Sequence, residues 1–308
     1  MTKTSHSDTP VLRLIGWLLL LLGVTGVATA TVALWQAARL WSSPDLLRMM
    51  PGFSGSHMGE LLQKGMSGLY SLALIVVGLA LLRRVRWARW AATAVLLFDI
   101  AWTLLDPLIH ALIFWYPLYL SHLSELRYLL FGLLNVLPDV VMVLFLVPVD
   151  SGVGQGRALQ RAAAAVQGYL TRSLPVVVAF IALYLLAHGL SQLSGIPNAV
   201  ANLHLPATGG NPIRLLLVLN GILLLLPLVN SVAGLALLTR LRGGVGMALG
   251  ALGFEVISML IELAFMVTII IGERILSPVF VITVLFAPVF LAANVLLAVY
   301  LLRYRAAA

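Results

Sequence analysis

The chain has 308 residues, of which 61% are hydrophobic and 10% are charged, and its formal net charge is +8. Its mean hydropathy is +1.06. Soluble domains average roughly 45–50% apolar and ~25% charged residues, so water is not the main solvent of this chain. The sequence contains no cysteine, which excludes disulfides, thiolate metal sites and cysteine nucleophiles.

Apolar runs of membrane-spanning length recur along the chain. An α-helix crosses a bilayer core with about 20 mostly apolar residues, and runs such as Leu18 to Leu22 lack the alternation of a β-barrel strand. The first run, from Val11 to Trp35, is too long for the core of a cleavable signal. We therefore expect an all-α integral membrane protein with eight spans, at about 11–35, 66–83, 89–115, 127–148, 173–193, 213–238, 244–272 and 277–302.

The positions of the basic residues predict the orientation of these spans. Most of the 19 basic residues fall on one side, including the cluster from Arg83 to Arg89 and the pair Arg240 and Arg242. Because cytoplasmic loops are enriched in Lys and Arg, both termini are predicted to be cytoplasmic, in a prokaryotic inner membrane. The positive charge is then a topology signal, and the expected surroundings are the lipid bilayer and not nucleic acid.

One short segment resembles known proteins. The stretch from Gly78 to Trp90, which ends in Trp87-Ala-Arg-Trp90, is similar to the second loop of several small four-helix bacterial membrane families of unassigned function. Positive-inside charge and interfacial tryptophan account for the pattern. The resemblance implies nothing about activity.

An internal repeat is the most informative feature of the sequence. Gly78-Leu-Ala-Leu-Leu82 recurs as Gly234-Leu-Ala-Leu-Leu238, an offset of 156 positions from Gly78 to Gly234. The same offset pairs two acidic residues with two others, namely Asp99 with Glu255 and Asp106 with Glu262. Because charged residues are rare inside membrane spans, this coincidence predicts a tandem duplication.

The duplication predicts the domain organisation. We expect a first four-helix repeat at 1–148, a cytoplasmic linker at 149–172 and a second four-helix repeat at 173–308. An even number of helices in each repeat gives both copies the same orientation, as in parallel-repeat transporters. The alanine-rich linker is expected to form a short surface helix. The long outer connections at 36–65 and 194–212 are interpreted as connectors or as caps, the first of them interfacial or re-entrant.

Acidic side chains inside the predicted spans are the main candidates for function. Asp99 and Asp106 lie seven positions apart, which places them on one helix face about 10 Å apart. An ionisable residue in a span usually faces the bundle interior. Helical rise predicts two polar layers at different depths. The inner one contains Asp99, Asp139, Glu255, Asn230 and Asn294, and the outer one contains Asp106 and Glu262, with His110 and His188 nearby.

Two functions fit this pattern. No Lys or Arg lies in the interior of the predicted spans, so the buried carboxyl groups must be protonated, share protons, meet water or bind a cation. This favours a proton- or cation-coupled transporter or channel. Its relay groups would be Asp99, Asp106, Asp139, Glu255 and Glu262, supported by Asn230, Asn294, His110 and His188. The alternative is a non-catalytic subunit or scaffold of a membrane complex, whose acids hydrogen-bond between helices or pair with a partner protein.

Metal binding and helix distortion are further hypotheses. Asp106 and His110 lie four positions apart and could form an O/N metal site with His188 and Glu262, or the two histidines could ligate a b-type haem. Histidine near a membrane interface is also ordinary, so no cofactor is assigned and the metal question stays open. No catalytic residue is assigned either, and an enzyme is the less favoured class. Pro107 and Pro138 predict local helix distortion beside buried acids.

Overall fold

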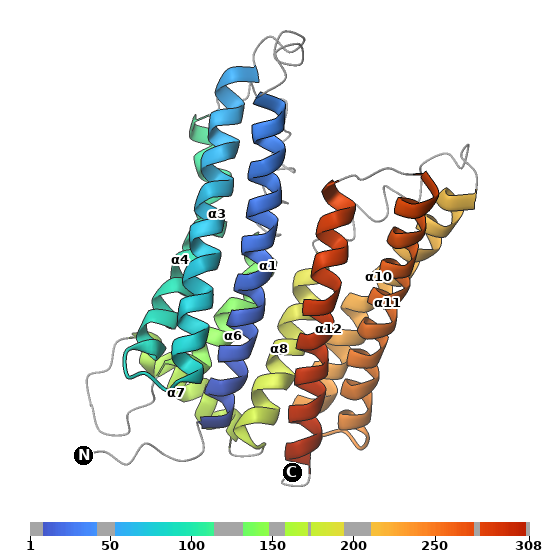
Figure 1. Ribbon diagram of the computed structural model, residues 1–308. Helices are drawn as coiled ribbons and strands as arrows, with labels where there is room; N and C mark the ends of the chain where they lie inside the picture. The colour runs from blue at the N-terminus through green and yellow to red at the C-terminus, as the bar shows by residue number, and fades with distance from the viewer. Residues whose placement is uncertain are drawn as a thin grey trace. The chain divides into compact units, whose positions relative to one another are not determined.

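The structure, a computed structural model, describes residues 9–41, 53–113, 132–147, 158–171, 174–193, 211–273 and 278–305 (Figure 1). All the secondary structure in these ranges is helical, which confirms the all-α prediction. The helices are α1 (Thr9–Trp41), α3 (Phe53–Leu82), α4 (Ala88–Ile113), α6 (Leu137–Leu146), α7 (Ala158–Thr171), α8 (Val176–Gln192), α10 (Asn211–Leu238), α11 (Gly244–Glu273) and α12 (Pro278–Arg305).

The length and apolar character of the helices identify a membrane protein. Among the described residues, five helical segments are long and apolar enough to cross a bilayer: Pro10–Trp35, Gly65–Leu82, Ala88–Leu105, Gly244–Ile261 and Ala287–Tyr304. Shorter apolar helical segments lie at Leu137–Leu146, Val176–Gln192 and Leu225–Leu238. At ~1.5 Å per residue, α6 covers only about 15 Å, half of a ~30 Å bilayer core.

Two predicted connections are largely helical. Helix continues into the outer connection expected at 36–65 from both sides, because α1 extends to Trp41 and α3 begins at Phe53, while the apolar segments long enough to cross a bilayer end at Trp35 and begin at Gly65. A helix need not end at the edge of the bilayer core. Residues 42–52, on which the re-entrant interpretation depends, lie outside the described residues. In the alanine-rich segment the expected short helix is present as α7.

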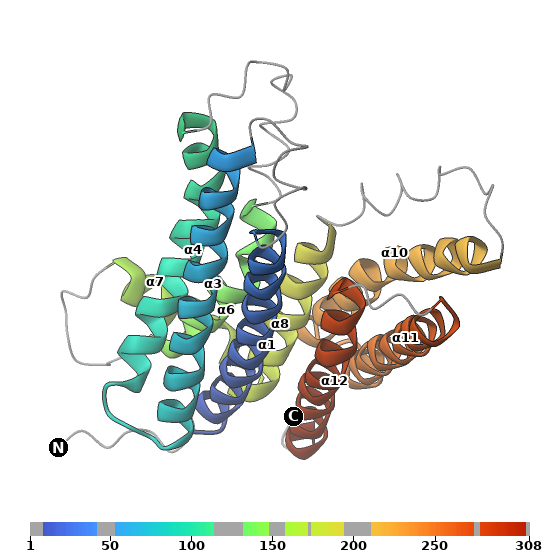
Figure 2. The same ribbon diagram turned by 45° about the horizontal axis from the view of Figure 1, so that its top comes forward.

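The chain divides into two compact units that do not follow chain order. One contains residues 1–12, 89–258 and 294–308, and the other contains 13–88 and 259–293. The first unit includes α4, α6, α7, α8 and α10, which can be followed in Figures 1 and 2. Within it, α8 packs against both α10 and α6, and α7 packs against α6 and α8. The second unit contains the close pair α1 and α3.

Two helix pairs, one in each unit, pack through the same set of close backbone contacts. A Cβ atom on Gly78 of α3 would lie 2.8 Å from both the Gly16 oxygen and the Leu20 nitrogen of α1. A Cβ on Gly234 of α10 would lie 2.6 Å from the Ala182 oxygen and the Leu186 nitrogen of α8. The glycines differ by the 156-position offset of the sequence repeat. Small residues thus bring the backbones of both pairs close together.

The same correspondence extends along these helix pairs. A Cβ on Gly23 would approach the Ser71 oxygen and the Ile75 nitrogen, and one on Gly189 would approach the Pro227 oxygen and the Ser231 nitrogen. On α3 and α10 the corresponding positions are again 156 apart, and on α1 and α8 they are 166 apart, from Gly23 to Gly189. The helices of the two pairs therefore contact each other at equivalent sequence positions, which we call their shared register.

Exposed apolar side chains also fall at matching positions of α3 and α10. The stripe on α3 consists of Leu69, Leu72, Val76 and Leu79, and that on α10 of Leu225, Leu228, Val232 and Leu235, all between 40% and 64% exposed. Each member of the second set follows its counterpart by 156 positions. Such apolar stripes suit a lipid environment, since soluble monomers rarely expose contiguous apolar surface.

The turns after α3 and α10 share an unusual backbone. Arg84 and Arg240 adopt φ angles of 56° and 55°, and no other non-glycine residue in the described ranges has a positive φ. The Val85 nitrogen donates to the Ala80 oxygen, and the Leu241 nitrogen donates to the Ala236 oxygen, both at 3.0 Å. These are the closing hydrogen bonds of a helix C-terminus that ends in a left-handed residue.

An Arg84→Gly substitution should stabilise the protein. A left-handed conformation costs a non-glycine residue roughly 1–2 kcal/mol, and glycine removes that cost but gives up about 0.5–1 kcal/mol through the freedom of the unfolded chain. The expected net gain is about 0.5–1 kcal/mol, measured as a higher thermal unfolding midpoint in detergent. Arg86→Gly, which removes the same charge without a positive φ, is the control. Equal midpoints for the two variants would contradict the expectation.

Candidate functional site

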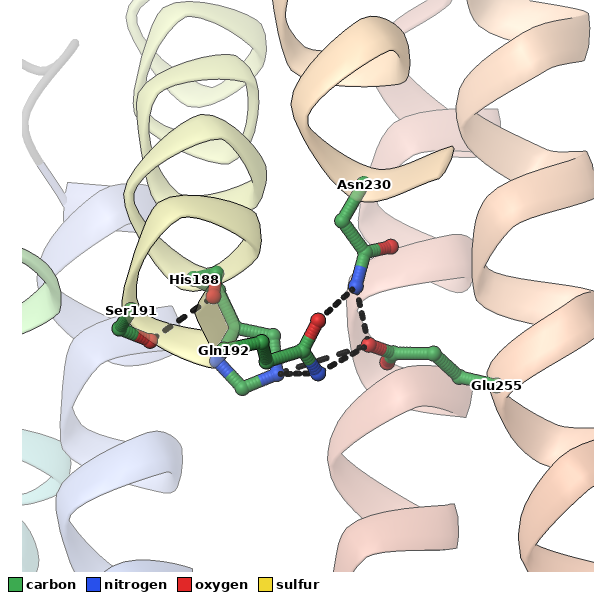
Figure 3. Close-up of polar contacts among 5 residues, drawn as sticks. All are labelled: His188, Ser191, Gln192, Asn230 and Glu255. Carbon is green, nitrogen blue, oxygen red and sulfur yellow. Dashed lines mark hydrogen bonds and ion pairs between the residues drawn. The ribbon is translucent and has the colours of Figure 1, made fainter. Parts of the chain in front are cut away.

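Glu255 is the centre of a polar cluster in the first compact unit (Figure 3). Its side chain on α11 is buried, at 4% exposure. Its Oε1 atom accepts a short hydrogen bond from Asn230 Nδ2 and a 3.4 Å hydrogen bond from Gln192 Nε2. His188 Nε2 lies 3.5 Å from the same oxygen. Side chains from α8, α10 and α11 thus converge on one carboxylate oxygen, an arrangement that supports the ionised form.

His188 has a choice of hydrogen-bond roles in this cluster. Its Nε2 atom lies 3.2 Å from Gln192 Nε2 as well as close to Glu255. An amide nitrogen only donates, so the hydrogen bond with Gln192 requires an unprotonated Nε2, whereas donation to Glu255 requires a proton on Nε2. The position of one proton therefore decides which neighbour His188 binds.

Helix direction explains why residues at different heights meet. Side chains of a helix lean toward its N-terminus. Gln192 is the last residue of α8, so its long side chain reaches back along α8 toward Glu255. Asn230 lies on α10, which runs antiparallel to α8, because Gly234 near the end of α10 packs against Ala182 near the start of α8. Its side chain consequently leans the opposite way, and the amide groups meet, with Asn230 Nδ2 donating to Gln192 Oε1 at 3.2 Å.

His188 occupies a different layer from the one expected. The sequence predicts it near Asp106 and Glu262, but the structure places it against Glu255. The expected span began at residue 173, whereas α8 begins at Val176. At ~1.5 Å per residue, His188 is then about 18 Å along its helix, close to the ~16 Å from Gly244 to Glu255. A boundary error of one helical turn accounts for the misplacement.

A row of stacked rings leads away from this cluster along α8. His188 stacks on Tyr184 with ring centroids 5.9 Å apart and planes inclined by 8°, and Tyr184 stacks on Phe180, also at 5.9 Å. Phe180 meets Phe145 of α6 edge to face at 5.3 Å. The spacing of four residues on α8 aligns these rings on one face. Tyr184 is close enough to interact electrostatically with both Glu255 and Asp139.

Asp99 of α4 and Asp139 of α6 form a second acidic centre in the same unit. Their carboxyl groups are close enough to interact electrostatically, and both side chains are half-buried. A break in the helix precedes Asp139: the helical residues 132–135 end in a turn at Val136, and α6 starts afresh at Leu137 with Pro138 in its first turn. The distortion expected at Pro138 is thus present, whereas α4 continues as a helix through Pro107 to Ile113.

The remaining predicted residues fall outside these two centres. Asn294 is buried on α12 at 6% exposure; within the described part of the chain it makes none of the contacts to Glu255. The side chains of Asp106, His110 and Glu262 lie outside the described residues. The haem and metal hypotheses depend on these side chains. In the described ranges, no group of three or more His, Cys, Asp or Glu side chains is placed to hold a metal ion.

Two participants were missed from the sequence. Gln192 donates to Glu255, and Tyr184 lies in reach of both acidic centres. A glutamine four positions after a histidine in an apolar run is the signal that could have found Gln192, because the two residues share a helix face. Tyr184 offers no comparable signal, since a tyrosine in a membrane helix is common at either interface.

The first helix pair has no counterpart of the Glu255 cluster. By the shared register, Leu22, Gly26 and Leu74 stand where His188, Gln192 and Asn230 stand in the second pair. Gly26 leaves no room for a longer side chain, because its Cβ would lie 2.0 Å from Ser71 Oγ. The polar partners of Glu255 are therefore specific to the second pair, while Asp99, its counterpart, pairs with Asp139 instead.

Comparison with known proteins adds no further assignment. The chain matches no protein-family model, no curated protein and no solved structure.

Proposed function

We propose that this membrane protein is a small transporter or channel in which buried carboxyl groups carry a proton or another cation across the bilayer. The observation that carries the proposal is the presence of two acidic centres, Glu255 with its polar partners and the Asp99–Asp139 pair, in one compact unit. Tyr184 lies within electrostatic reach of both. Acidic side chains in membrane segments are costly and commonly mark ion pathways.

An unpaired acceptor beside Glu255 adds support. Asn230 is fully buried, and among the described residues its Oδ1 atom has no hydrogen-bond partner. Ser258 Oγ, one helical turn beyond Glu255 on α11, is also buried and has no hydrogen-bond partner among the described residues. Buried polar atoms are nearly always satisfied, and the exceptions call for water or an ion. Oxygen acceptors beside a carboxylate suit a hydrated cation or a proton-carrying water.

The proposed architecture is eight spans in two like-oriented four-helix repeats, with both termini cytoplasmic in a prokaryotic inner membrane. The shared register of the pairs α1–α3 and α8–α10, and the matching left-handed arginines after each pair, support a duplication. The first repeat would cover 1–148 and the second 173–308, joined by a linker that contains α7.

A flux measurement on the full chain in liposomes tests this function. Wild-type protein should dissipate a proton or alkali-cation gradient, and a variant combining Asp99→Asn with Glu255→Gln should lose most of that flux, because neither amide can hold and release a cation. Glu273→Gln, at the far end of α11, is the matched control and should behave as wild type. Folded wild-type protein that moves none of the tested ions would refute the proposal.

A second candidate is a non-catalytic subunit of a membrane complex. It is favoured by one observation: Asn230, Gln192 and His188, the partners of Glu255, all come from the chain itself, as expected of hydrogen bonds that only join helices. Co-purification of a stable protein partner from native membranes, together with no ion flux by the isolated chain, would favour this candidate.

A further inference from the structure

The hydrogen bonds around Glu255 determine which way the amide of Asn230 faces. Asn230 Nδ2 donates to Glu255 Oε1 and, at 3.2 Å, to Gln192 Oε1. Both partners are acceptor oxygens, so the reverse orientation would place Oδ1 against them. Both N–H groups are then in use, and Oδ1 lies on the other side of the amide (Figure 3). Asn230 is fully buried, and its Oδ1 has no hydrogen-bond partner among the described residues.

Ser258 provides a second buried oxygen without a partner. Other hydroxyl groups in the described helices donate to a carbonyl three or four residues earlier, as do those of Thr25, Thr29, Thr31, Ser71, Thr93, Ser191 and Thr239. Ser258 Oγ makes no such bond in the described part of the chain. Ser258 lies three residues after Glu255, on the same face of α11, and its side chain leans back toward the level of Glu255.

Glu255 supplies the negative charge of this site. Within the described ranges its hydrogen bonds and its ion pair all end on Oε1, which leaves Oε2 for another ligand. Carboxylate, carbonyl and hydroxyl oxygens are the ligands of hard cations. One carboxylate balances one positive charge, whereas a divalent ion would leave a net charge in a buried site, which is costly. The site therefore fits a monovalent cation.

His188 competes with such a cation for the charge of Glu255. Its Nε2 atom lies 3.5 Å from Glu255 Oε1 and 3.2 Å from Gln192 Nε2. A protonated His188 donates to Glu255 and supplies one positive charge, whereas a neutral His188 that accepts from Gln192 supplies none. A cation and a protonated His188 beside the same carboxylate would repel each other. The cluster therefore holds one of the two at a time.

Few other ionisable groups surround His188 in the described ranges. The described side chains of α10 carry no charge. Besides Glu255, the titratable or charged groups on α8 and on the helices α6 and α7 that pack against it are Tyr184, which stacks on His188, Asp139, which is in electrostatic reach of Tyr184, and the exposed Arg161 and Tyr169. Glu255 is thus the ion-pair partner of His188.

We infer that this cluster binds an alkali-metal cation in exchange for a proton on His188. The ligands are Glu255 Oε2, Asn230 Oδ1 and Ser258 Oγ. The inference rests on the proposed function, of which it names the substrate and the coupling. In the exchange the cation gains its oxygen ligands, the Nε2–H bond of His188 breaks, and the proton leaves to water. One positive charge enters and one leaves, so the total charge of the cluster does not change.

Thermal unfolding of the full chain in detergent tests the cation site without any transport. Sodium, potassium and lithium chloride are each compared with choline chloride at equal ionic strength. At least one alkali cation should raise the unfolding midpoint, because a ligand that binds only the folded state stabilises it. Equal midpoints in all four salts would show that the buried oxygens bind water only, and would overturn the inference.

Ser258→Ala tests the assignment of the ligands. The variant should keep its midpoint in choline, since no hydrogen bond of the described chain is lost, and it should bind the cation about tenfold more weakly, as expected on loss of a polar contact to a charged group. Ser71→Ala, which removes a buried hydroxyl of α3, is the matched control and should leave the affinity unchanged. Equal affinities in the two variants would overturn Ser258 as a ligand.

The pH dependence of cation affinity tests the exchange with His188. Between about pH 5 and 8, where histidine changes its charge, the wild-type affinity should fall as the pH falls, by up to about tenfold per pH unit when one proton leaves for each cation bound. His188→Gln keeps a polar partner that cannot be protonated, and its affinity should not vary over this range. The same pH dependence in both proteins would overturn the role of His188.

Flux in liposomes separates this inference from the proposed function. A gradient of the bound cation should drive protons in the opposite direction through wild-type protein and not through His188→Gln. Cation binding as described in a folded protein that moves no ion would overturn the proposed function and leave the binding site standing. Proton flux that depends on no alkali cation would overturn the exchange and leave the proposed function standing.

Discussion

Replacing Gly234 with alanine is expected to destabilise the protein by about 1–3 kcal/mol, the usual cost of forcing an extra carbon into a well-packed contact. The added Cβ would lie 2.6 Å from backbone atoms of Ala182 and Leu186, and backbone atoms cannot rotate aside as the end of a side chain does. The pair α8–α10 must therefore move apart, which loosens the helices that present His188 and Asn230. The measurement is the thermal unfolding midpoint in detergent.

Gly253→Ala is the matched control for this substitution. Gly253 lies inside α11, and a Cβ there meets nothing within 4 Å. Alanine favours a helix interior over glycine by roughly 1 kcal/mol, so this variant should be as stable as wild type or slightly more stable. The same chemical change then has opposite effects at the two positions. Equal midpoints for Gly234→Ala and Gly253→Ala would show that α8 and α10 are not in close contact.

A double-mutant cycle on Asn230 and Glu255 should separate a packing role from a transport role. Asn230→Leu, which copies Leu74 of the first helix pair, removes a donor to a buried carboxylate and should cost about 1.5–3 kcal/mol. Adding Glu255→Met removes the charge that was left unpaired, and most of the lost stability should return, because an apolar pair of similar shape is often as stable as a buried polar one.

The double variant should nevertheless transport no ions. Stability from thermal unfolding and flux in liposomes are measured on the same preparations. Asn294→Leu combined with Glu255→Met is the control cycle, and its two effects should add, since Asn294 is not among the hydrogen-bond partners of Glu255 in the described residues. A double variant that is stable and still moves ions would assign the Glu255 cluster to helix packing alone.

The axial positions of polar residues could be predicted because helical rise is constant. Asp99 and Asp139 were placed at similar depth, and they are close enough to interact electrostatically; Asn230 and Glu255 were also placed at similar depth, and they are hydrogen-bonded. Composition alone was enough to predict a helical membrane protein. Both results depend on quantities that a single helix determines, namely its length, its rise and its apolar character.

The identity of helix neighbours could not be predicted from such quantities. The packing of α8 against α10 beside Glu255 depends on close glycine contacts, and a glycine in an apolar run does not indicate which helix it contacts. Gln192 was missed because a long side chain crosses more than one helical turn of depth. His188 was misplaced because its expected depth fell between the two proposed layers, which are about 10 Å apart, and the later start of α8 at Val176 moves it about 4.5 Å toward the inner one.

The contact between Gly26 and Ser71 distinguishes the first helix pair from the second. Because a Cβ on Gly26 would meet Ser71 Oγ at 2.0 Å, a glutamine at this position requires a change at Ser71 as well. A copy of the Glu255 cluster in the first helix pair would therefore need a change at Ser71 in addition to changes at Leu22, Gly26 and Leu74. If both halves descend from one ancestral gene segment, one copy has since lost either the tight contact or the polar cluster. Related sequences with a small residue at position 192 would identify the tight contact as the older state.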